Sequence, residues 1–463
     1  MRTAALSIPA VRLIRARRPY LRAMRSFLRL APILFLTPAL AAPPLTGEAA
    51  FGDWRADAPG VARHIRPQDL PAQGATAPSS AHVRVVPKPA DVLPKVPAGF
   101  AIAPLATGIA GARTLRFAPN GDLFVARSAD GAVTALRLAA DGASVKEKKT
   151  FATGVDGAFG LAFWPPGPDP KWLYVAGTTT IVRFPYKAGD LAASGKPETI
   201  VRGLPDGGHS TRDLVFSRDG SRMFVSVGSE SNVAEDMGKR PSDLVAFEKT
   251  RATGAAWGSE DLRASVLVFD PQGQNRRIFA TGLRNCVGMA LAPASDRLWC
   301  AVNERDMLGD DLPPDYATEV RDGAFYGWPW FYIGAHADKR AGARPDLADK
   351  VRVPDVLIQA HSAPLGIAFY DSERFPSDYR GNAFVALHGS WNRGKRTGYK
   401  IVRLRFADGA PTGVYEDFVT GFVLDEKSVF GRPVSVAVAP DGDLLFSEDG
   451  NGVIWRVTYA GAR

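Results

Sequence analysis

Histidines of this 463-residue chain stand beside arginines in combinations that suit acid–base chemistry. His209 follows two glycines and is three residues before Arg212. An imidazole titrates near neutrality and can take a proton from a substrate hydroxyl. We therefore predict that His209 is a general base and that Arg212 is its catalytic neighbour. The alternative is a histidine that only supports a strand start by hydrogen bonding.

Other polar residues recur at matching places of a repeated hairpin pattern. The start of a hairpin's first strand and the end of its second share one edge, so residues in this phase are expected to ring one pocket. Before first strands lie Arg113, Asp156, His209, Arg212, Arg284, Asn285, His361 and Arg432, and after second strands lie Arg127, Glu230, Asn303, Glu304, His388, Glu448 and Asp449. The alternative is that strand ends are polar because they meet solvent.

Arginines interleaved with acids suit an anionic ligand together with a cation. Arginine pairs with carboxylates through two parallel hydrogen bonds. A hard cation such as Ca²⁺ prefers oxygen ligands, which the acidic loop 306–311 offers; a solvated acidic turn is the alternative. The sequence has no EF-hand loop, zinc-type His/Cys spacing, GxGxxG, Walker A or GxSxG motif.

Six similar hairpins would position these residues. Each has an apolar strand, a turn often built on Asn-Gly or Asp-Gly, and a second apolar strand. Their anchors lie 46 to 78 residues apart and are Phe117, Phe163, Phe216, Leu291, Phe369 and Val438. The pattern predicts an all-β fold, a six-bladed β-propeller of four-stranded antiparallel blades over residues 99–460. Residues 99–102 are expected to close the ring on the last blade, and a pair of β-sandwiches is the alternative.

The positive charge of the chain lies almost wholly in a leader. Of a formal net charge of +9, eight charges are arginines in residues 1–41, which contain no acid. This basic stretch and the apolar run Leu30–Leu36 predict a signal peptide over residues 1–41, or one that starts at Met24; an uncleaved anchor is the alternative. We expect a periplasmic or secreted protein with no nucleic-acid partner and no membrane-spanning segment after cleavage.

The two segments that follow the leader differ in character. Residues 42–98 are rich in proline and alanine, so we expect a mobile or surface-draped lead-in without regular helix or strand. Further on, Cys286 and Cys300 flank one predicted hairpin. In an oxidising compartment they could pair across its strands, and two buried free thiols are the alternative.

Several stretches, taken in order, resemble the soluble aldose and sorbosone dehydrogenases that depend on pyrroloquinoline quinone (PQQ). The similarity covers about residues 97–459 and is greatest to the sorbosone dehydrogenase-like branch. The stretches are Phe159–Pro165, Gly208–Arg212, Leu283–Asn285, Asn303–Asp306, Tyr326–Pro329, His361–Gly366 and His388–Arg393.

The resemblance implies a six-bladed propeller that oxidises a sugar or sugar aldehyde by hydride transfer to PQQ and passes electrons to a cytochrome or quinone. It implies His209 as the base, Arg284 and Asn285 at the quinone end of PQQ, Arg432 on a PQQ carboxylate, and Glu448 nearby. It places a Ca²⁺ ion on carbonyls of Asp306 and Met307. The remaining predicted cofactor contacts are Glu230, His361, Arg393 and Lys395.

The chain departs from the glucose-oxidising branch at three positions. Gly208 stands where an aspartate precedes the base, Val155 where a glutamine contacts PQQ, and Gly389 where a lysine is expected. Arg393 or Lys395 would replace that lysine. Two other functions remain open: a Ca²⁺-dependent lactonase-like hydrolase without a redox cofactor, and a propeller that binds a sugar or protein without catalysis.

Overall fold

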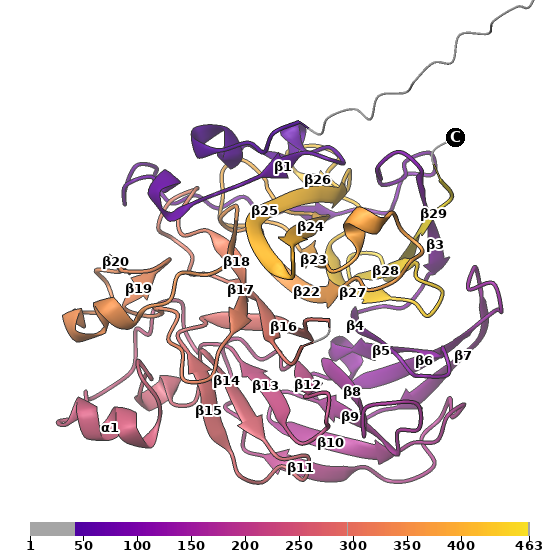
Figure 1. Cartoon of the computed structure of the whole chain (residues 1–463), viewed down its shortest axis with the longest axis horizontal. Helices are drawn as coiled ribbons and strands as arrows, with labels where there is room; N and C mark the ends of the chain where they lie inside the picture. Colours follow the sequence, from indigo (N-terminus) through magenta and orange to yellow (C-terminus); the bar gives the residue numbers. More distant parts are fainter. Residues whose placement is uncertain (1–41, 294, 462–463) are drawn as a thin grey trace, which may run out of the picture. The chain divides into compact units, whose positions relative to one another are not determined.

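The computed structural model describes residues 42–293 and 295–461, so the predicted signal peptide lies outside the described residues. In the described part, six antiparallel sheets of four or five strands surround a central channel (Figure 1). Each sheet is one blade. The predicted six-bladed β-propeller of four-stranded blades is confirmed.

Blades 1 to 3 each run along the chain from the innermost to the outermost strand. Their strands are β4 (Ala112–Phe117), β5 (Leu123–Arg127), β6 (Ala132–Leu138) and β7 (Val145–Ala152); β8 (Gly160–Trp164), β9 (Trp172–Ala176), β10 (Thr180–Pro185) and β11 (Glu198–Arg202); and β12 (Leu214–Phe216), β13 (Met223–Val227), β14 (Ser265–Phe269) and β15 (Arg277–Thr281).

Blades 4 to 6 complete the ring, and the outermost strands of blades 5 and 6 come from an earlier, distant part of the chain. Their strands are β16 (Asn285–Leu291), β17 (Leu298–Asn303), β18 (Asp315–Val320) and β21 (Val356–Ile358); β22 (Pro364–Phe369), β23 (Ala383–Leu387), β24 (Lys400–Ala407), β25 (Ala410–Val419) and β1 (Ala62–Arg63); and β27 (Pro433–Val438), β28 (Leu444–Glu448), β29 (Val453–Tyr459) and β3 (Phe100–Ala106).

The remaining elements are short. They are α1 (Leu244–Thr250), the pairs β2 (Arg84–Val85) with β26 (Ser428–Val429) and β19 (Phe331–Tyr332) with β20 (His336–Ala337), and the 3-10 helices η1 (Gly47–Phe51), η2 (Trp54–Ala56), η3 (Pro67–Asp69), η4 (Ser128–Asp130), η5 (Gly258–Glu260), η6 (Pro345–Lys350) and η7 (Ser377–Tyr379). No helix among the described residues is long and apolar enough to cross a membrane.

The innermost strands β4, β8, β12, β16, β22 and β27 contact one another around the channel. Gly366 in β22 shows how closely they approach, because a Cβ atom there would lie 2.6 Å from Ser435 Cα in β27. This close packing leaves a void of only about 20 Å³ inside the channel. A ligand larger than water therefore has room at the end of the channel but not within it.

Strand β3 closes the ring as the sequence predicts. It pairs with β29 in blade 6, with Phe100 opposite Tyr459 and Ile102 opposite Val457, and extends beyond the predicted residues to Ala106. Figure 1 shows β3, from early in the chain, beside β29 from its end. The two ends of the propeller sequence are thus held in one sheet.

The lead-in of residues 42–98 packs against the propeller. The prediction that its prolines exclude strands is wrong at β1 and β2, each two residues long. Arg63 of β1 is fully buried and contacts Asp57 at 2.8 Å and Asp417 of β25 at 3.0 Å, while Lys400 of β24 contacts the same two carboxylates. Removing one member of such a buried cluster costs about 3–5 kcal/mol, so the lead-in is firmly attached to blade 5.

Cys286 of β16 and Cys300 of β17 form a disulfide with Cα atoms 5.8 Å apart. The disulfide alternative is therefore confirmed. The bond joins the two innermost strands of blade 4, directly after Asn285.

Candidate active site

A cavity of about 120 Å³ opens where the innermost strands begin, and we call it the mouth cavity. The start of each first strand lies beside the end of the second, as in the pairs Asn285–Asn303 and Pro433–Glu448, so the predicted edge exists. The cavity is formed by blades 3 to 5 and lined by His209, Arg284, Asn285, Asn303, Glu304, Asp306, Asp315, His361, Ala363 and Trp391.

The protonation of His209 follows from its neighbours. Its Nδ1 lies 2.9 Å from the Ser229 carbonyl oxygen, which can only accept a hydrogen bond. Nδ1 therefore carries the proton, and in the neutral ring Nε2 is left with a free lone pair. Burial, together with the charge of Arg284, lowers the pKa of His209 to about 4. At neutral pH this histidine is a proton acceptor.

Gly228 makes room for two of the cavity side chains. A Cβ atom at this position would lie 2.5 Å from Asn285 Oδ1 and 2.6 Å from His209 Cβ. Any larger residue would push the two side chains apart. The sequence reasoning missed Gly228, because a glycine at the end of β13 carries no local signal for what packs over it.

Arg284 is fixed by backbone carbonyls rather than by a full ion pair. Its Nε donates to the Asn232 carbonyl at 3.1 Å and its Nη1 to the Glu304 carbonyl at 2.8 Å, while Nη2 lies 3.5 Å from Asp306 Oδ2. Asn285 beside it is buried, and its Oδ1 has no hydrogen-bond partner among the described residues. An immobile cation and an unsatisfied acceptor thus face one cavity, which is typical of a site that binds a polar ligand.

Asn232 holds Arg284 and Asp306 in place, and the sequence reasoning missed it. Its Oδ1 accepts from Arg284 Nη2 at 3.1 Å and from the Asp306 N–H at 2.8 Å, and its Nδ2 donates to the Asp306 carbonyl at 3.0 Å.

His361 lies on the opposite wall in a left-handed conformation, with φ of 64°. Its Nε2 is 2.9 Å from the Gly309 carbonyl and its Nδ1 is 3.5 Å from Asp306 Oδ1. Burial would raise the pKa of Asp306, but its interactions with His361 and Arg284 outweigh that effect and lower it. Asp306 is accordingly an ionised carboxylate in the cavity wall.

Asp315 is a cavity residue that the sequence reasoning did not select. It starts β18 and accepts hydrogen bonds from the backbone N–H groups of Glu304 at 2.8 Å and Ala363 at 2.9 Å, so it joins two walls of the cavity. Burial raises the pKa of Asp315 to about 7 and that of Glu304 to about 8. Both carboxyls therefore favour the protonated form more than an exposed carboxyl does.

A second polar group lies at the same strand ends on blades 1, 5 and 6. This His388 cluster consists of Arg113, His388, Arg432 and Asp449. Asp449 accepts from Arg113 Nη1 at 2.6 Å and contacts His388 Nε2 at 2.9 Å. Arg432 Nε is buried without a hydrogen-bond partner among the described residues. The cluster has two arginines for one ionised carboxylate and therefore an excess of positive charge.

Two predicted site residues are turned away from the cavity. Arg212 is fully buried, and its guanidinium donates to the carbonyls of Pro205 and His209 at 2.6 Å and of Thr211 at 2.8 Å. We correct its role from catalytic neighbour to positioning residue for the His209 loop. Glu448 accepts from the backbone N–H groups of Asn451 and Val453 and stabilises the turn after β28.

Four more predicted residues do not line the mouth cavity. Glu230 is paired with Arg263 at 2.6 Å, and Lys395 is exposed. Arg393 is paired with Asp311 at 2.7 Å and donates to the Phe51 carbonyl in the lead-in at 2.9 Å. Met307, the second predicted calcium residue, has a half-exposed side chain. Polar residues at strand ends can thus bind backbone or neighbouring loops instead of a ligand.

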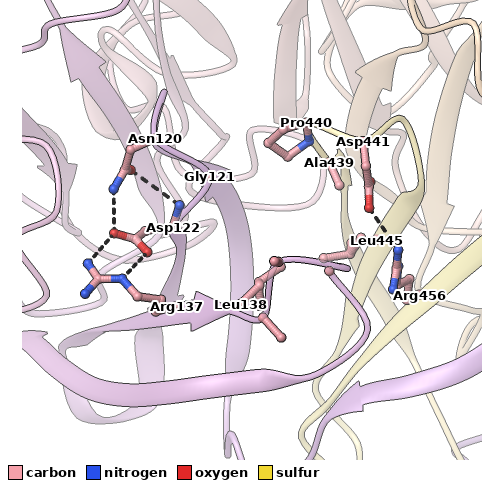
Figure 2. Close-up of a pocket in the computed structure, with 13 residues that line it drawn as sticks. Asn120, Gly121, Asp122, Arg137, Leu138, Ala439, Pro440, Asp441, Leu445 and Arg456 are labelled. Atoms are coloured by element: carbon pink, nitrogen blue, oxygen red, sulfur yellow. Dashed lines mark hydrogen bonds and ion pairs between the residues drawn. The ribbon is translucent and has the colours of Figure 1, made fainter.

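A larger cavity lies away from this chemistry. It has a volume of about 320 Å³ and is formed by turns of blades 1 and 6 at the other ends of the innermost strands (Figure 2). Its charges are paired, with Arg137 bound to Asp122 at 2.9 and 3.0 Å and Arg456 to Asp441 at 2.9 Å. Fully paired charges leave few groups for a ligand, so the mouth cavity is the better candidate despite its size.

Known proteins with similar sequences include two sugar dehydrogenases. The PQQ-dependent pyranose dehydrogenase of Coprinopsis cinerea is 25% identical over 421 residues, which cover 78% of this chain and 54% of that protein. The aldose sugar dehydrogenase YliI of Escherichia coli is 28% identical over 204 residues, which cover 42% of this chain and 51% of that protein. The matches thus span about half the length of these relatives.

Solved structures show the same fold. The holo form of the PQQ domain of the Coprinopsis cinerea pyranose dehydrogenase superimposes with a TM-score of 0.65 at 22% identity, covering 80% of this chain and 98% of that domain. A sequence model of the family described as TrAA12-like matches residues 94–317 and 338–460, which is most of the chain. The propeller, the ring of polar strand ends and this match agree, and the chain belongs to the TrAA12-like family.

Proposed function

We propose that this protein is a PQQ-dependent dehydrogenase that oxidises a sugar or sugar aldehyde at the mouth cavity, with His209 as the general base. The observation that carries the proposal is the free Nε2 of His209, held beside Arg284 and the unsatisfied Asn285 Oδ1. The names of the relatives from Coprinopsis cinerea and Escherichia coli support the same class of reaction.

The chain's residues suit PQQ, which is a planar quinone with three carboxylates. When bound, PQQ supplies the electrophilic carbonyl that accepts the hydride. Arg432, with its buried and unpartnered Nε, and Arg113 would hold carboxylates. Arg284 and Asn285 would bind the quinone end, next to the base. The excess positive charge of the His388 cluster supports this orientation.

His209 would accept the proton of the substrate hydroxyl at its Nε2, while the hydride leaves the carbon atom that bears this hydroxyl. The hydrogen bond from Nδ1 to the Ser229 carbonyl fixes the ring and its tautomer. Burial, together with the nearby charge of Arg284, keeps the ring neutral before the reaction, so no proton has to be removed first. Arg212 would act indirectly by holding the loop that carries His209.

Calcium has weaker support than PQQ. The Asp306 carbonyl, one of the two predicted ligands, already accepts a hydrogen bond from Asn232. We keep Ca²⁺ at Asp306 and Met307 as a prediction from the resemblance alone and assign it no step. Titration of the chelator-treated protein with Ca²⁺, read as a change in PQQ affinity, tests it.

Sorbosone, or another sugar aldehyde, is the proposed substrate by resemblance, with a cytochrome or quinone as external electron acceptor. A periplasmic or secreted location fits the Cys286–Cys300 disulfide, since such bonds persist in oxidising compartments.

Reconstitution tests the proposal. Purified protein is incubated with PQQ, with or without Ca²⁺, and reduction of an electron-accepting dye is followed with hexoses, pentoses and sorbosone. We expect turnover that depends on PQQ with at least one sugar. Equal turnover without PQQ, or hydrolysis of lactones without PQQ as the only activity, would overturn it.

A further inference from the structure

The lead-in supports two loops that contribute residues to the wall of the mouth cavity. Between residues 76 and 82 it contacts two loops, 306–311 and 389–396. The Ala81 N–H donates to the Trp391 carbonyl at 2.7 Å, and the Asp310 N–H donates to Thr76 Oγ1 at 2.8 Å. Both loops are thus fixed by a segment that precedes the propeller.

Trp391 is the most prominent side chain on this wall. It lines the mouth cavity, yet 41% of its surface is exposed. Its ring stacks on His82 of the lead-in, with centroids 5.5 Å apart and planes within 9° of parallel. Stacking on His82 covers one face of the indole, and the backbone bond at Ala81 fixes the main chain that carries it. An exposed aromatic ring supported on one face beside a polar cavity is typical of a binding surface.

Met307 is a second exposed apolar residue and contacts Asn392, the neighbour of Trp391 in the sequence, although it does not itself line the mouth cavity. It is 42% exposed, and Asn392 binds it by accepting from the Met307 N–H at 2.7 Å and placing Nδ2 3.0 Å from Met307 Sδ. The mouth cavity therefore combines the apolar face of Trp391 with charged and hydrogen-bonding walls. A sugar ring has the matching character, because its axial C–H groups form an apolar face and its hydroxyls surround the edge.

We infer that Trp391, supported by His82, is the platform on which the apolar face of a sugar ring stacks while its reacting hydroxyl reaches His209. The platform selects ring-form sugars over short acyclic aldehydes, because only a ring covers the indole. The inference rests on the proposed function for the reaction, but sugar binding at Trp391 can be measured separately.

The kinetic test compares Trp391→Ala and Trp391→Phe with the parent enzyme loaded with PQQ. We expect Trp391→Ala to raise KM for a hexopyranose about tenfold with kcat changed less than about threefold, and to leave KM for glyceraldehyde unchanged. Trp391→Phe should recover most of the loss, and His82→Ala should show a smaller rise. His336→Ala is the matched control, since His336 stacks on Tyr332 outside the cavity. An equal rise of KM for both substrates, or none, overturns the platform.

A binding test does not need turnover. The protein is labelled with 5-fluorotryptophan, and the ¹⁹F resonance of Trp391 is identified by its loss in Trp391→Phe. Titration with a hexopyranose should shift this resonance, whereas glyceraldehyde at equal concentration should not. A shift without turnover supports the platform and contradicts the dehydrogenase proposal. Turnover of the sugar with an unshifted Trp391 resonance contradicts the platform and leaves the dehydrogenase proposal intact.

Discussion

His209 precedes the first strand of blade 3 and His388 follows the second strand of blade 5, so both lie at the same end of the propeller, yet their surroundings differ. Burial is the main reason that the pKa of each is lowered to about 4. The difference is in the nitrogen that each ring has bonded. His209 uses Nδ1 on a carbonyl and keeps Nε2 free, whereas His388 uses Nε2 on Asp449.

The protonation of Asp449 decides what His388 can do. Burial opposes its ionisation, but the hydrogen bond with His388 and the charge of Arg113 outweigh this and lower its pKa. An ionised carboxylate only accepts hydrogen bonds, so His388 Nε2 is a donor. Both neutral rings thus donate one N–H and keep one lone pair, on Nε2 in His209 and on Nδ1 in His388. Only His209 lines the mouth cavity, so the tautomer together with the place of the ring, and not the degree of burial, separates the base from the structural group.

Replacing each histidine by glutamine should show the largest difference between the two residues. His209→Gln keeps a donor for the Ser229 carbonyl but cannot take a proton, so we expect kcat to fall roughly 10²–10⁴-fold. His388→Gln keeps a donor for Asp449, so we expect kcat to fall less than about tenfold. Steady-state dye reduction with saturating PQQ measures both. Similar losses in the two variants would remove the distinction between them.

Substitutions of basic residues test whether the His388 cluster binds the carboxylates of PQQ. Arg432→Met should raise the PQQ dissociation constant about tenfold to a hundredfold, because a charged hydrogen bond to a carboxylate is lost. Lys395→Met should leave it unchanged, since Lys395 is exposed and belongs neither to the mouth cavity nor to the His388 cluster. Absorbance titration with PQQ gives both constants. Weaker binding in the Lys395 variant alone would place the carboxylates elsewhere.

The pH dependence of kcat/KM reports the protonation of the general base His209 in the enzyme without substrate. Protonated His209 cannot accept a proton, so activity should be lost as pH falls through about 4, rather than near the usual histidine value of 6.5. Arg284→Met removes a positive charge and should move this acid limb to higher pH, whereas His388→Gln should leave it in place. An acid limb near 6.5 in the parent enzyme would mean that His209 is not held neutral as described.

Removal of the Cys286–Cys300 disulfide, which lies beside the mouth cavity, should change the stability of the protein but not its activity. Cys286→Ala with Cys300→Ala should lower the free energy of unfolding by about 3 kcal/mol, because the bond closes a short loop. We expect kcat to change less than about twofold, since neither cysteine lines the cavity. Calorimetry and dye reduction measure the two effects. A large loss of activity at a temperature where the variant is folded would show that the bond positions Asn285.

Local patterns were enough to predict most of the fold. The apolar alternation and the Asn-Gly and Asp-Gly turns lie within each hairpin, so all six innermost pairs and the closing strand β3 could be anticipated. The attachment of the lead-in to the propeller could not be predicted, because it depends on contacts such as that of Arg63 with Asp417, which are 354 residues apart in the sequence.

The site was predictable in place but not in detail. Strand phase brings His209, Arg284, Asn285 and His361 to one cavity, as expected from the repeat. Phase indicates the edge on which a residue lies but not the direction of its side chain, so Arg212 and Glu448, which bind backbone, were misassigned. Trp391 needed the fold, because its support comes from His82 in the distant lead-in.

The most direct test of the account follows bound PQQ in a single turnover. Parent protein and His209→Gln are each loaded with PQQ, mixed with excess sugar without any electron acceptor, and the PQQ absorbance is recorded with time. We predict that both bind PQQ with similar affinity and that the sugar reduces PQQ at least a hundredfold more slowly in His209→Gln. Equal reduction rates, or no PQQ binding by the parent protein, would contradict the account.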